Sequence, residues 1–196
     1  MNRIKAVIFD LNGVFLLSKN LSERLSEKSG KAVDEILAVM KPILKEVRNL
    51  ERRGEEVWQP LLDLVGMDLI EFLDFYFSGE SIDVEMLEFA RSLKKKGVSI
   101  FILSNNFRER TEYYRKNFPM LFEVANKTYF SWETGLVKPD VRSYSRLLEE
   151  NNLEGKDCIY IDNSIENLEV AESLGIKGVK YESGEQVMEE IDEMVG

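Results

Sequence analysis

The sequence predicts a doubly wound α/β fold, in which helices cover both faces of a parallel sheet, with an all-helical segment inserted after the first strand. Short apolar runs alternate with stretches of helical periodicity through residues 81–196. Three of the apolar runs in the chain are followed directly by Asp or Ser. The insertion is predicted because residues 17–80, between the first two runs, are far longer than one crossover connection needs.

The first element is the apolar run of residues 4–9, which ends abruptly at Asp10. A β-branched run of this length, followed by Gly13, is typical of a buried parallel strand that leads into a turn. Ligands bind at the carboxyl ends of the strands in open α/β sheets, so Asp10 stands where chemistry is expected. Taken alone, Asp10 is better explained as a residue that only caps a turn.

Residues 17–80 form the second unit of the sequence, and every periodic stretch in them is helical. Apolar residues recur there at spacings of three and four, and Pro42 should begin or kink one of the helices. We therefore expect residues 17–80 to form a helical cap over the strand ends. Residues 1–16 and 81–196 are expected to form the α/β core.

Strands and helices then alternate to the end of the chain. The helix before the second strand ends in three lysines and Gly97, which suit the negative end of a helix dipole and a left-handed stop. Asn106 and Glu109 have the spacing of a capping box for the helix after that strand. The expected strands are residues 98–103, 128–131, 158–161 and 176–181, and the expected helices begin near residues 81 or 83, 107, 141, 165 and 184.

Composition excludes several classes of function. The 196 residues carry 26 Lys and Arg against 36 Asp and Glu, and this net charge of −10 argues against nucleic acid and anionic membranes as partners. The chain contains no His, so Ser-His-Asp and Cys-His catalysis are excluded.

Cys158, the single cysteine, lies in an apolar run and is expected to be a buried structural thiol. One cysteine, no leader-like segment and no apolar stretch near ~20 residues predict a cytoplasmic protein.

Polar side chains follow the ends of the expected strands. Asp10 follows the first, Ser104 the second, and Asp162 with Asn163 the fourth, while Lys138 lies in the loop after the third. Because the carboxyl ends of parallel strands meet at one edge of a sheet, these side chains should face one crevice. A carboxylate can act there as a nucleophile, a hydroxyl and a Lys can hold phosphoryl oxygens, and two carboxylates suit Mg²⁺. The pattern predicts a phosphoryl-transfer site.

These residues belong to four short motifs: Asp10-Leu11-Asn12-Gly13-Val14, Leu103-Ser104-Asn105, Gly135-Leu136-Val137-Lys138-Pro139-Asp140, and Ile161-Asp162-Asn163-Ser164 with Asn167. Together the motifs resemble those of the haloacid dehalogenase (HAD) superfamily, over essentially the whole chain. The resemblance implies a Rossmann-like core with a helical cap of the C1 type. Residues 54–58 also resemble a segment in caps of the glucose-1-phosphatase-like and epoxide-hydrolase N-terminal-like branch.

The resemblance implies a role for each residue of the site. Asp10 is the expected nucleophile, Ser104 binds phosphate, and Lys138 stabilises charge. Asn12 occupies the position where phosphatases of the superfamily usually carry a catalytic acid. The residues expected to bind phosphate are Leu11, Asn12, Ser104, Asn105 and Lys138, and the expected Mg²⁺ ligands are Asp10, Asn12, Asp162 and Asn163.

Two amides depart from the family pattern. Asn12 replaces an acid that protonates the leaving group and then activates water, and such help is worth about 10²–10⁴ in rate. Asn163 replaces a second acid beside Asp162 and should weaken the affinity for Mg²⁺. Because Asn12 precedes Gly13, deamidation to Asp is a further hypothesis. Some relatives in this branch also lack the acid at the position of Asn12 and still hydrolyse phosphate esters.

Three functions are therefore compared. The first is a Mg²⁺-dependent phosphomonoesterase acting on a small metabolite, such as a sugar phosphate. The second is a degenerate member that binds a ligand or partner without turnover, suggested by Asn12 and Asn163. The third, a 2-haloacid dehalogenase, fits the Asp nucleophile but explains neither Asp162 nor the third motif. No feature of the sequence predicts the oligomeric state.

The insertion offers few residues for substrate specificity. Candidates that could face a substrate are Lys19, Arg52, Arg53 and Trp58. Each is also explained by surface charge or by packing between helices, and this second interpretation is preferred.

Overall fold

The parallel sheet expected from the sequence is present in the computed structural model, which describes residues 3–49 and 55–195. Within these residues the main sheet has five strands in the order β5-β4-β1-β6-β7, all parallel, with β1 in the centre. Phe9 of β1 pairs with Ile102 of β4 and with Ile161 of β6. The strands are β1 Ala6–Phe9, β4 Ser99–Ser104, β5 Lys127–Phe130, β6 Cys158–Asp162 and β7 Lys177–Lys180.

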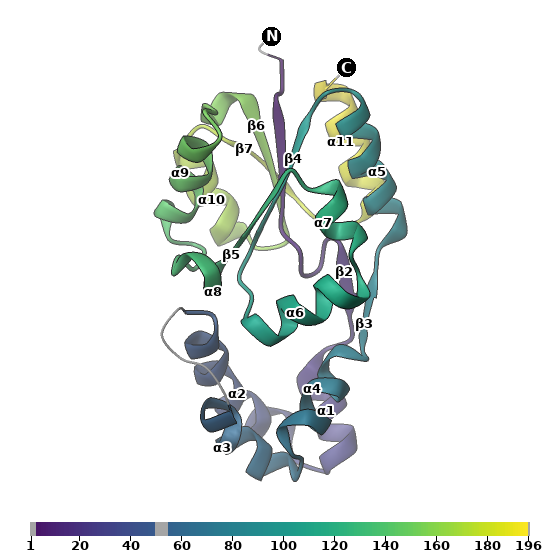
Figure 1. Ribbon diagram of the computed structural model, residues 1–196, viewed down its shortest axis with the longest axis vertical. Coiled ribbons are helices and arrows are strands. Elements are labelled where there is room, and N and C mark those ends of the chain that lie inside the picture. Colours follow the sequence, from purple (N-terminus) through teal and green to yellow (C-terminus); the bar gives the residue numbers. More distant parts are fainter. Residues whose placement is uncertain (1–2, 50–54, 196) are drawn as a thin grey trace.

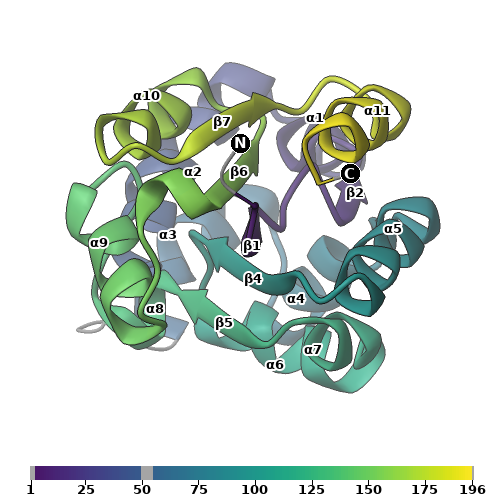
Figure 2. The ribbon, with the colours of Figure 1, turned by 90° about the horizontal axis from the view of Figure 1, so that it is seen from above.

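Helices cover both faces of this sheet, as Figure 2 shows from above. Neighbouring residues of a strand point to opposite faces, so Val7 and Phe9 pack with α5, α7 and α11, while Ala6 and Ile8 pack with α9 and α10. The doubly wound fold is confirmed. The helices of this part are α5 Val84–Lys95, α6 Arg108–Asn117, α7 Met120–Val124, α8 Ser131–Thr134, α9 Val141–Glu150, α10 Ile165–Ser173 and α11 Gly184–Val195, with a 3-10 turn at Gly155–Asp157.

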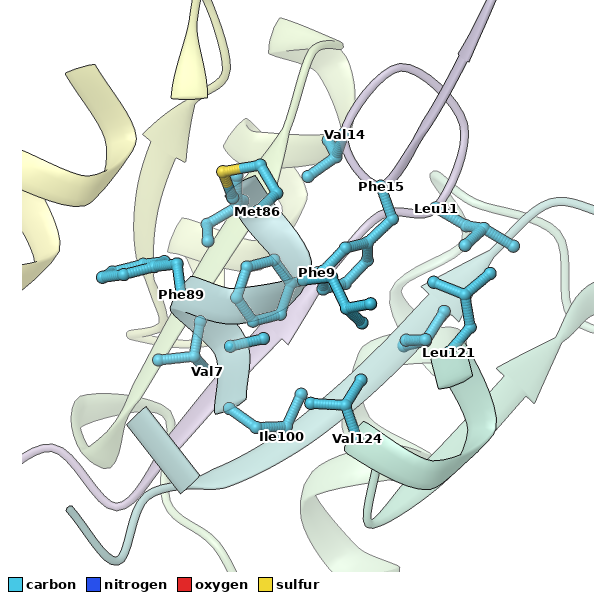
Figure 3. Packing of buried hydrophobic residues seen from close by; sticks show 14 of the residues in the cluster. Val7, Phe9, Leu11, Val14, Phe15, Met86, Phe89, Ile100, Leu121 and Val124 are labelled. Carbon is cyan, nitrogen blue, oxygen red and sulfur yellow. The ribbon is translucent and has the colours of Figure 1, made fainter. Parts of the chain in front are cut away.

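Apolar packing holds the end of β1 in place. Figure 3 shows Phe9 and Phe15 together with Met86 and Phe89 of α5, and the rings of Phe9 and Phe15 lie 4.7 Å apart between centroids. Leu11, the residue after Asp10, is also fully buried. Asp10 therefore follows a strand whose position is determined by the core on both sides of it.

A separate group of helices lies beyond the carboxyl ends of the strands. Figure 1 shows this α1–α4 segment (residues 21–77) at the lower end of the molecule, with both chain termini at the opposite end. It has its own apolar cluster around Trp58, which Phe107 joins from the loop before α6. The helices are α1 Leu21–Ser29, α2 Val33–Val47, α3 Glu55–Val65 and α4 Leu69–Phe77.

Two short strands connect the α1–α4 segment to the rest of the chain. β2 (Leu16–Ser18) and β3 (Glu80–Ile82) pair antiparallel, with Leu16 opposite Ile82. Neither strand was predicted from the sequence. Three residues are too few to show an alternating pattern, and the partner strands are far apart along the chain.

Local details also differ from the predictions. α2 runs through Pro42, because Ile36, Met40 and Ile43 pack its apolar side while Pro42 remains exposed. The capping box expected at Asn106 is wrong: α6 begins at Arg108, and the buried Asn106 side chain bonds to the Phe107 N–H and to Thr111 instead. None of the helices within the described ranges is long and apolar enough to cross a membrane.

Candidate active site

The sheet brings three of the expected residues to adjacent strand ends. Asp10 follows β1, Ser104 ends β4 and Asp162 ends β6, and β1 lies between the other two strands. The Asp10 N–H donates to the Ile161 carbonyl at 2.8 Å, so the parallel pairing extends to the residue that carries the carboxylate. This edge of the sheet therefore carries one polar side chain at the end of each of three neighbouring strands.

Lys138 lies between the two carboxylates. Its Nζ donates to Asp10 Oδ1 at 2.9 Å and to Asp162 Oδ2 at 2.8 Å, and the Lys138 side chain is buried. The main chain of Lys138 is held from both sides by Asn105, whose Oδ1 accepts from the Lys138 N–H and whose Nδ2 donates to the Lys138 carbonyl, both at 2.8 Å. Asn105 thus positions the lysine loop, and its side-chain amide is occupied in doing so.

Tyr160 is a member of this group that the sequence analysis missed. Its hydroxyl accepts from Lys138 Nζ at 2.8 Å and donates to Asp162 Oδ2. Tyr160 lies two residues before Asp162 on β6, so the two side chains point to the same face of the sheet. Side chains two residues apart on a strand share a face, so the spacing between Tyr160 and Asp162 in the sequence could have pointed to Tyr160.

The two carboxylates differ in their electrostatic environment. Burial raises the pKa of Asp10; Lys138 opposes this shift, and the negative charge of Asp162 adds to it. Burial also acts on Asp162, but Lys138 and hydrogen bonds from Tyr160 and the Ser164 N–H hold its pKa below the usual value. Asn167 Nδ2 adds a further bond to Asp162 at 2.9 Å. Asp162 is therefore the more stably ionised of the pair.

Asn12 is oriented by two neighbours. Its Nδ2 donates to Ser104 Oγ at 3.2 Å, and the Tyr114 hydroxyl donates to its Oδ1 at 3.4 Å. The contact with Tyr114 of α6 was not predicted either. Beside Asn12, the Leu11 N–H bonds to the Asp10 carboxylate, while the Leu11 side chain is buried. A ligand can therefore contact the main chain of Leu11 but not its buried side chain.

Gly13 makes the turn after Asn12 possible. Its φ is +85°, a left-handed conformation that favours glycine. A Cβ on Gly13 would lie 2.4 Å from Asn163 Nδ2, so the exposed Asn163 side chain sits directly against this turn. The first and fourth motifs thus meet at Gly13 and Asn163.

The donors at this edge fit Mg²⁺. Asp10 and Asp162 both contact one ammonium group, so their oxygens converge. No cluster of three or more Asp, Glu, Cys or His side chains suitable for a metal occurs in residues 3–49 and 55–195. Mg²⁺ is commonly held by one or two carboxylates and completes its shell with water and phosphate oxygens, so two carboxylates with neutral oxygens from Asn12 and Asn163 suit it.

Two of the remaining sequence candidates, Trp58 and Lys19, lie elsewhere. Trp58 is buried, with its ring centroid 5.0 Å from that of Phe72, so it packs between helices. Lys19 lines an open groove with Arg24 and Ser78, beside the β2–β3 pair. Arg52 and Arg53 fall outside the described residues.

Cys158 is a buried free thiol, as expected from the sequence, and burial raises its pKa to about 12.

Comparisons with known proteins identify the class. A family model for haloacid dehalogenase-like hydrolases matches residues 4–175. This chain belongs to that family, and its class is therefore that of a hydrolase.

Individual relatives are distant. Mouse bifunctional epoxide hydrolase 2 is 25% identical over 122 residues, which are 61% of this chain and 22% of that protein. The chain spans between 10% and 58% of the length of the curated relatives compared. A HAD family enzyme of Bacteroides thetaiotaomicron, solved with magnesium and inorganic phosphate, superposes with a TM-score of 0.80 at 21% identity, covering 92% of this chain and 96% of that one. A HAD phosphatase of Thermococcus onnurineus superposes with a TM-score of 0.64 at 20% identity, covering 92% of this chain and 87% of that one.

Proposed function

We propose that this hydrolase is a Mg²⁺-dependent phosphomonoesterase that acts on a small phosphorylated metabolite. The observation that carries the proposal is Lys138, whose ammonium joins Asp10 and Asp162 at adjacent strand ends. The Bacteroides enzyme that holds magnesium and phosphate, and the Thermococcus phosphatase, support it by likeness of fold.

Asp10 is the nucleophile in this proposal. One of its carboxylate oxygens attacks phosphorus, the bond from phosphorus to the ester oxygen breaks, and an aspartyl-phosphate forms while the leaving alkoxide takes up a proton from water. A water molecule then attacks the phosphorus, the bond from phosphorus to the Asp10 oxygen breaks, and inorganic phosphate leaves while the water's proton passes to solvent. Lys138 neutralises Asp10 and the phosphoryl group in transit, and the hydroxyl of Ser104, 3.2 Å from Asn12, holds a phosphoryl oxygen. The main chain of Leu11 and Asn105 adds N–H donors.

The metal ligands in the proposal are the carboxylates of Asp10 and Asp162, the carbonyl of Asn12 and the side-chain oxygen of Asn163. A bound Mg²⁺ would supply positive charge that draws the two carboxylates and the phosphate together. Asp162 is prepared for this role, because the Ser164 N–H and Asn167 already fix its orientation. Its lowered pKa keeps it ionised and ready to coordinate.

Asn12 limits the chemistry. An amide donates a hydrogen bond but no proton, and contacts with Ser104 and Tyr114 hold it in one orientation. The site therefore suits leaving groups that need little protonation, such as the anomeric phosphate of a sugar. Deamidation at Asn12 would restore a carboxylate, although the constrained turn at Gly13 should slow it. Peptide mass spectrometry that finds unmodified Asn12 in active protein excludes this route.

The α1–α4 segment is proposed to act as a cap, with residues 17–80 forming it and residues 1–16 and 81–196 forming the core. The β2–β3 pair supports this division, since it is the point at which the chain enters and leaves the segment. The cap lies beyond the carboxyl ends of the strands, on the side from which a substrate must arrive. A cytoplasmic location, with a small phosphorylated molecule as partner, completes the proposal.

The second candidate is a binding protein without turnover, and the amides at Asn12 and Asn163 favour it. A panel of phosphate esters, assayed with Mg²⁺ and with EDTA, separates the two. Metal-dependent release of phosphate that Asp10→Asn abolishes supports the phosphomonoesterase. No release from any ester by folded protein points to the binding protein, and chloride release from 2-haloacids in EDTA would point to a dehalogenase.

A further inference from the structure

The Lys138 ammonium uses all of its hydrogen-bond donors within the protein. A lysine ammonium carries three N–H donors. Two of them point to carboxylates, Asp10 Oδ1 at 2.9 Å and Asp162 Oδ2 at 2.8 Å. The third points to the Tyr160 hydroxyl, also at 2.8 Å. A phosphoryl oxygen that bonds to Lys138 must therefore take over a donor that is already in use.

Tyr160 reaches Lys138 from within the sheet. It precedes Asp162 by two residues on β6, so its Cα lies about 7 Å farther from the carboxyl edge of the sheet. On the neighbouring strand it pairs with Ile8, which precedes Asp10 by two residues. Tyr160 is also fully buried. The N–H that Lys138 directs to Tyr160 thus points away from the strand ends, where a substrate binds.

The bond from Lys138 to Asp10 is the one that the proposed chemistry weakens. An Asp10 oxygen forms its bond to phosphorus as the ester bond breaks, and the carboxylate becomes an acyl phosphate without its negative charge. Donors bond more strongly to a charged acceptor than to a neutral one, and the charge now lies on the phosphoryl oxygens. The Lys138 donor can then pass from Asp10 to a phosphoryl oxygen, provided that the ammonium stays in place.

Tyr160 and Asp162 can hold the ammonium during this change. The Tyr160 hydroxyl accepts from Lys138 and donates to Asp162 Oδ2, which itself accepts from Lys138, so the three groups form a closed ring of hydrogen bonds. Asn167 Nδ2 bonds to the same oxygen of Asp162 at 2.9 Å. Two of the three bonds to the ammonium are therefore independent of Asp10.

Packing alone does not explain the Tyr160 hydroxyl. The ring of Tyr160 packs against that of Tyr144, with 5.4 Å between centroids, and a phenylalanine would keep this contact. A buried hydroxyl is costly unless it is hydrogen-bonded. The bonds of this hydroxyl to Lys138 and Asp162 both lead to the proposed active site.

We propose that Tyr160 is a positioning residue, which anchors the Lys138 ammonium while one of its donors passes from Asp10 to the phosphoryl group. This inference rests on the proposed phosphomonoesterase function. The donor passes only as the aspartyl-phosphate forms, so Tyr160 stabilises the transition state more than the bound substrate.

The variant Tyr160→Phe tests this role, because it removes the hydroxyl and keeps the ring. In steady-state assays with Mg²⁺, kcat should fall about 10-fold while KM stays within about twofold of the wild-type value. Orthovanadate imitates the five-coordinate phosphoryl group in transit and should inhibit the variant about 10-fold more weakly. Inhibition by inorganic phosphate, which leaves Asp10 charged, should be unchanged.

Two controls separate this role from a loss of stability or of metal. Tyr129→Phe removes a hydroxyl from a buried tyrosine of β5, which bonds to Glu150 and Asn151 and not to the site, and should keep the wild-type kcat. The half-saturating Mg²⁺ concentration should be unchanged in Tyr160→Phe, because Asn167 and the Ser164 N–H still orient Asp162.

The possible outcomes are distinct. If Tyr160→Phe is folded by circular dichroism and keeps the wild-type kcat, the role of Tyr160 is refuted while the phosphomonoesterase proposal stands. An increase in KM alone, or in the Mg²⁺ required, also refutes it, since Tyr160 would then act on substrate binding or through the metal. An equal loss of kcat in Tyr129→Phe has the same meaning. Folded wild-type protein that hydrolyses no ester would overturn both proposals.

Discussion

Lys138 is the residue on which the other groups of the site converge. Its ammonium contacts Asp10, Asp162 and Tyr160, all within 2.9 Å. The sequence pointed to Lys138 and to both carboxylates, because each follows a strand and carries an obvious chemical group. Tyr160 was missed, since a tyrosine inside an apolar run is indistinguishable from an ordinary core residue until its hydroxyl is seen beside Asp162.

Replacing Asn12 by Asp should raise the phosphatase rate. A carboxyl group there can protonate the leaving oxygen, so we expect kcat to increase about 10²-fold or more for alkyl phosphates and much less for anomeric phosphates. Steady-state assays on one ester of each kind measure the difference. Asn117→Asp, an exposed change of the same kind, should leave both rates as they were. Equal rates in Asn12→Asp and wild type would show that protonation of the leaving group is not what limits the site.

Gly13 and Gly30 form a matched pair for testing the turn beside Asn12. Both have positive φ, +85° and +72°, so replacement by Ala should cost each about 1–2 kcal/mol of unfolding free energy. Only at Gly13 would the new Cβ meet another residue, the exposed side chain of Asn163, which can move away. Denaturant unfolding should therefore show similar losses, whereas activity should fall in Gly13→Ala alone. A similar loss of activity in Gly30→Ala would show that the turn at Gly13 is not the cause of the loss.

The Glu150 carboxylate on helix α9 forms a hydrogen bond that connects the helix to strand β5. Glu150 accepts from Lys127 of β5 at 2.6 Å and from Arg146 of its own helix at 2.7 Å. These bonds lower the pKa of Glu150 to about 2, Lys127 contributing most. The tie joins two elements that the sequence placed correctly but whose contact it did not predict.

The Glu150 tie should stabilise the protein only above a certain pH. Because its pKa is lower in the folded than in the unfolded chain, the stabilisation is complete above about pH 4.5 and is lost as the pH falls toward 2. The difference in Tm between wild type and Glu150→Gln should follow this course. Glu149→Gln, an exposed neighbour on α9, should show little difference at any pH. A difference in Tm that stays constant down to pH 2 would contradict the assignment.

At the scale of elements, predictions held where a segment is long and periodic. The strands around Asp10, Ser104 and Asp162 were located to within a residue or two, because buried parallel strands are continuous apolar runs. The β2–β3 pair was missed, and so was the true start of α6. Both depend on contacts with distant residues, such as the hydrogen bond from the Asn106 N–H to Ser131 Oγ, which no local pattern shows.

For the whole molecule, Mg²⁺ binding should appear as added stability. A ligand that binds only the folded state raises Tm with its concentration, so millimolar Mg²⁺ should raise the Tm of wild type and EDTA should reverse the shift. Asp162→Asn should show a much smaller shift, because it removes one of the two carboxylates proposed to hold the metal. Asp74→Asn, an exposed change in α4, should respond as wild type does. A full Mg²⁺ shift in Asp162→Asn would place the metal elsewhere.

The class of fold, the strand ends that carry Asp10, Ser104 and Asp162, and the helical insertion could all be predicted from the sequence. These follow from periodicity and from motifs that are local in the chain. Only the folded chain shows that Lys138 lies between two carboxylates and that Tyr114 orients Asn12. Such contacts join residues far apart in sequence, and they exist only after the apolar clusters of the core and of the α1–α4 segment have packed.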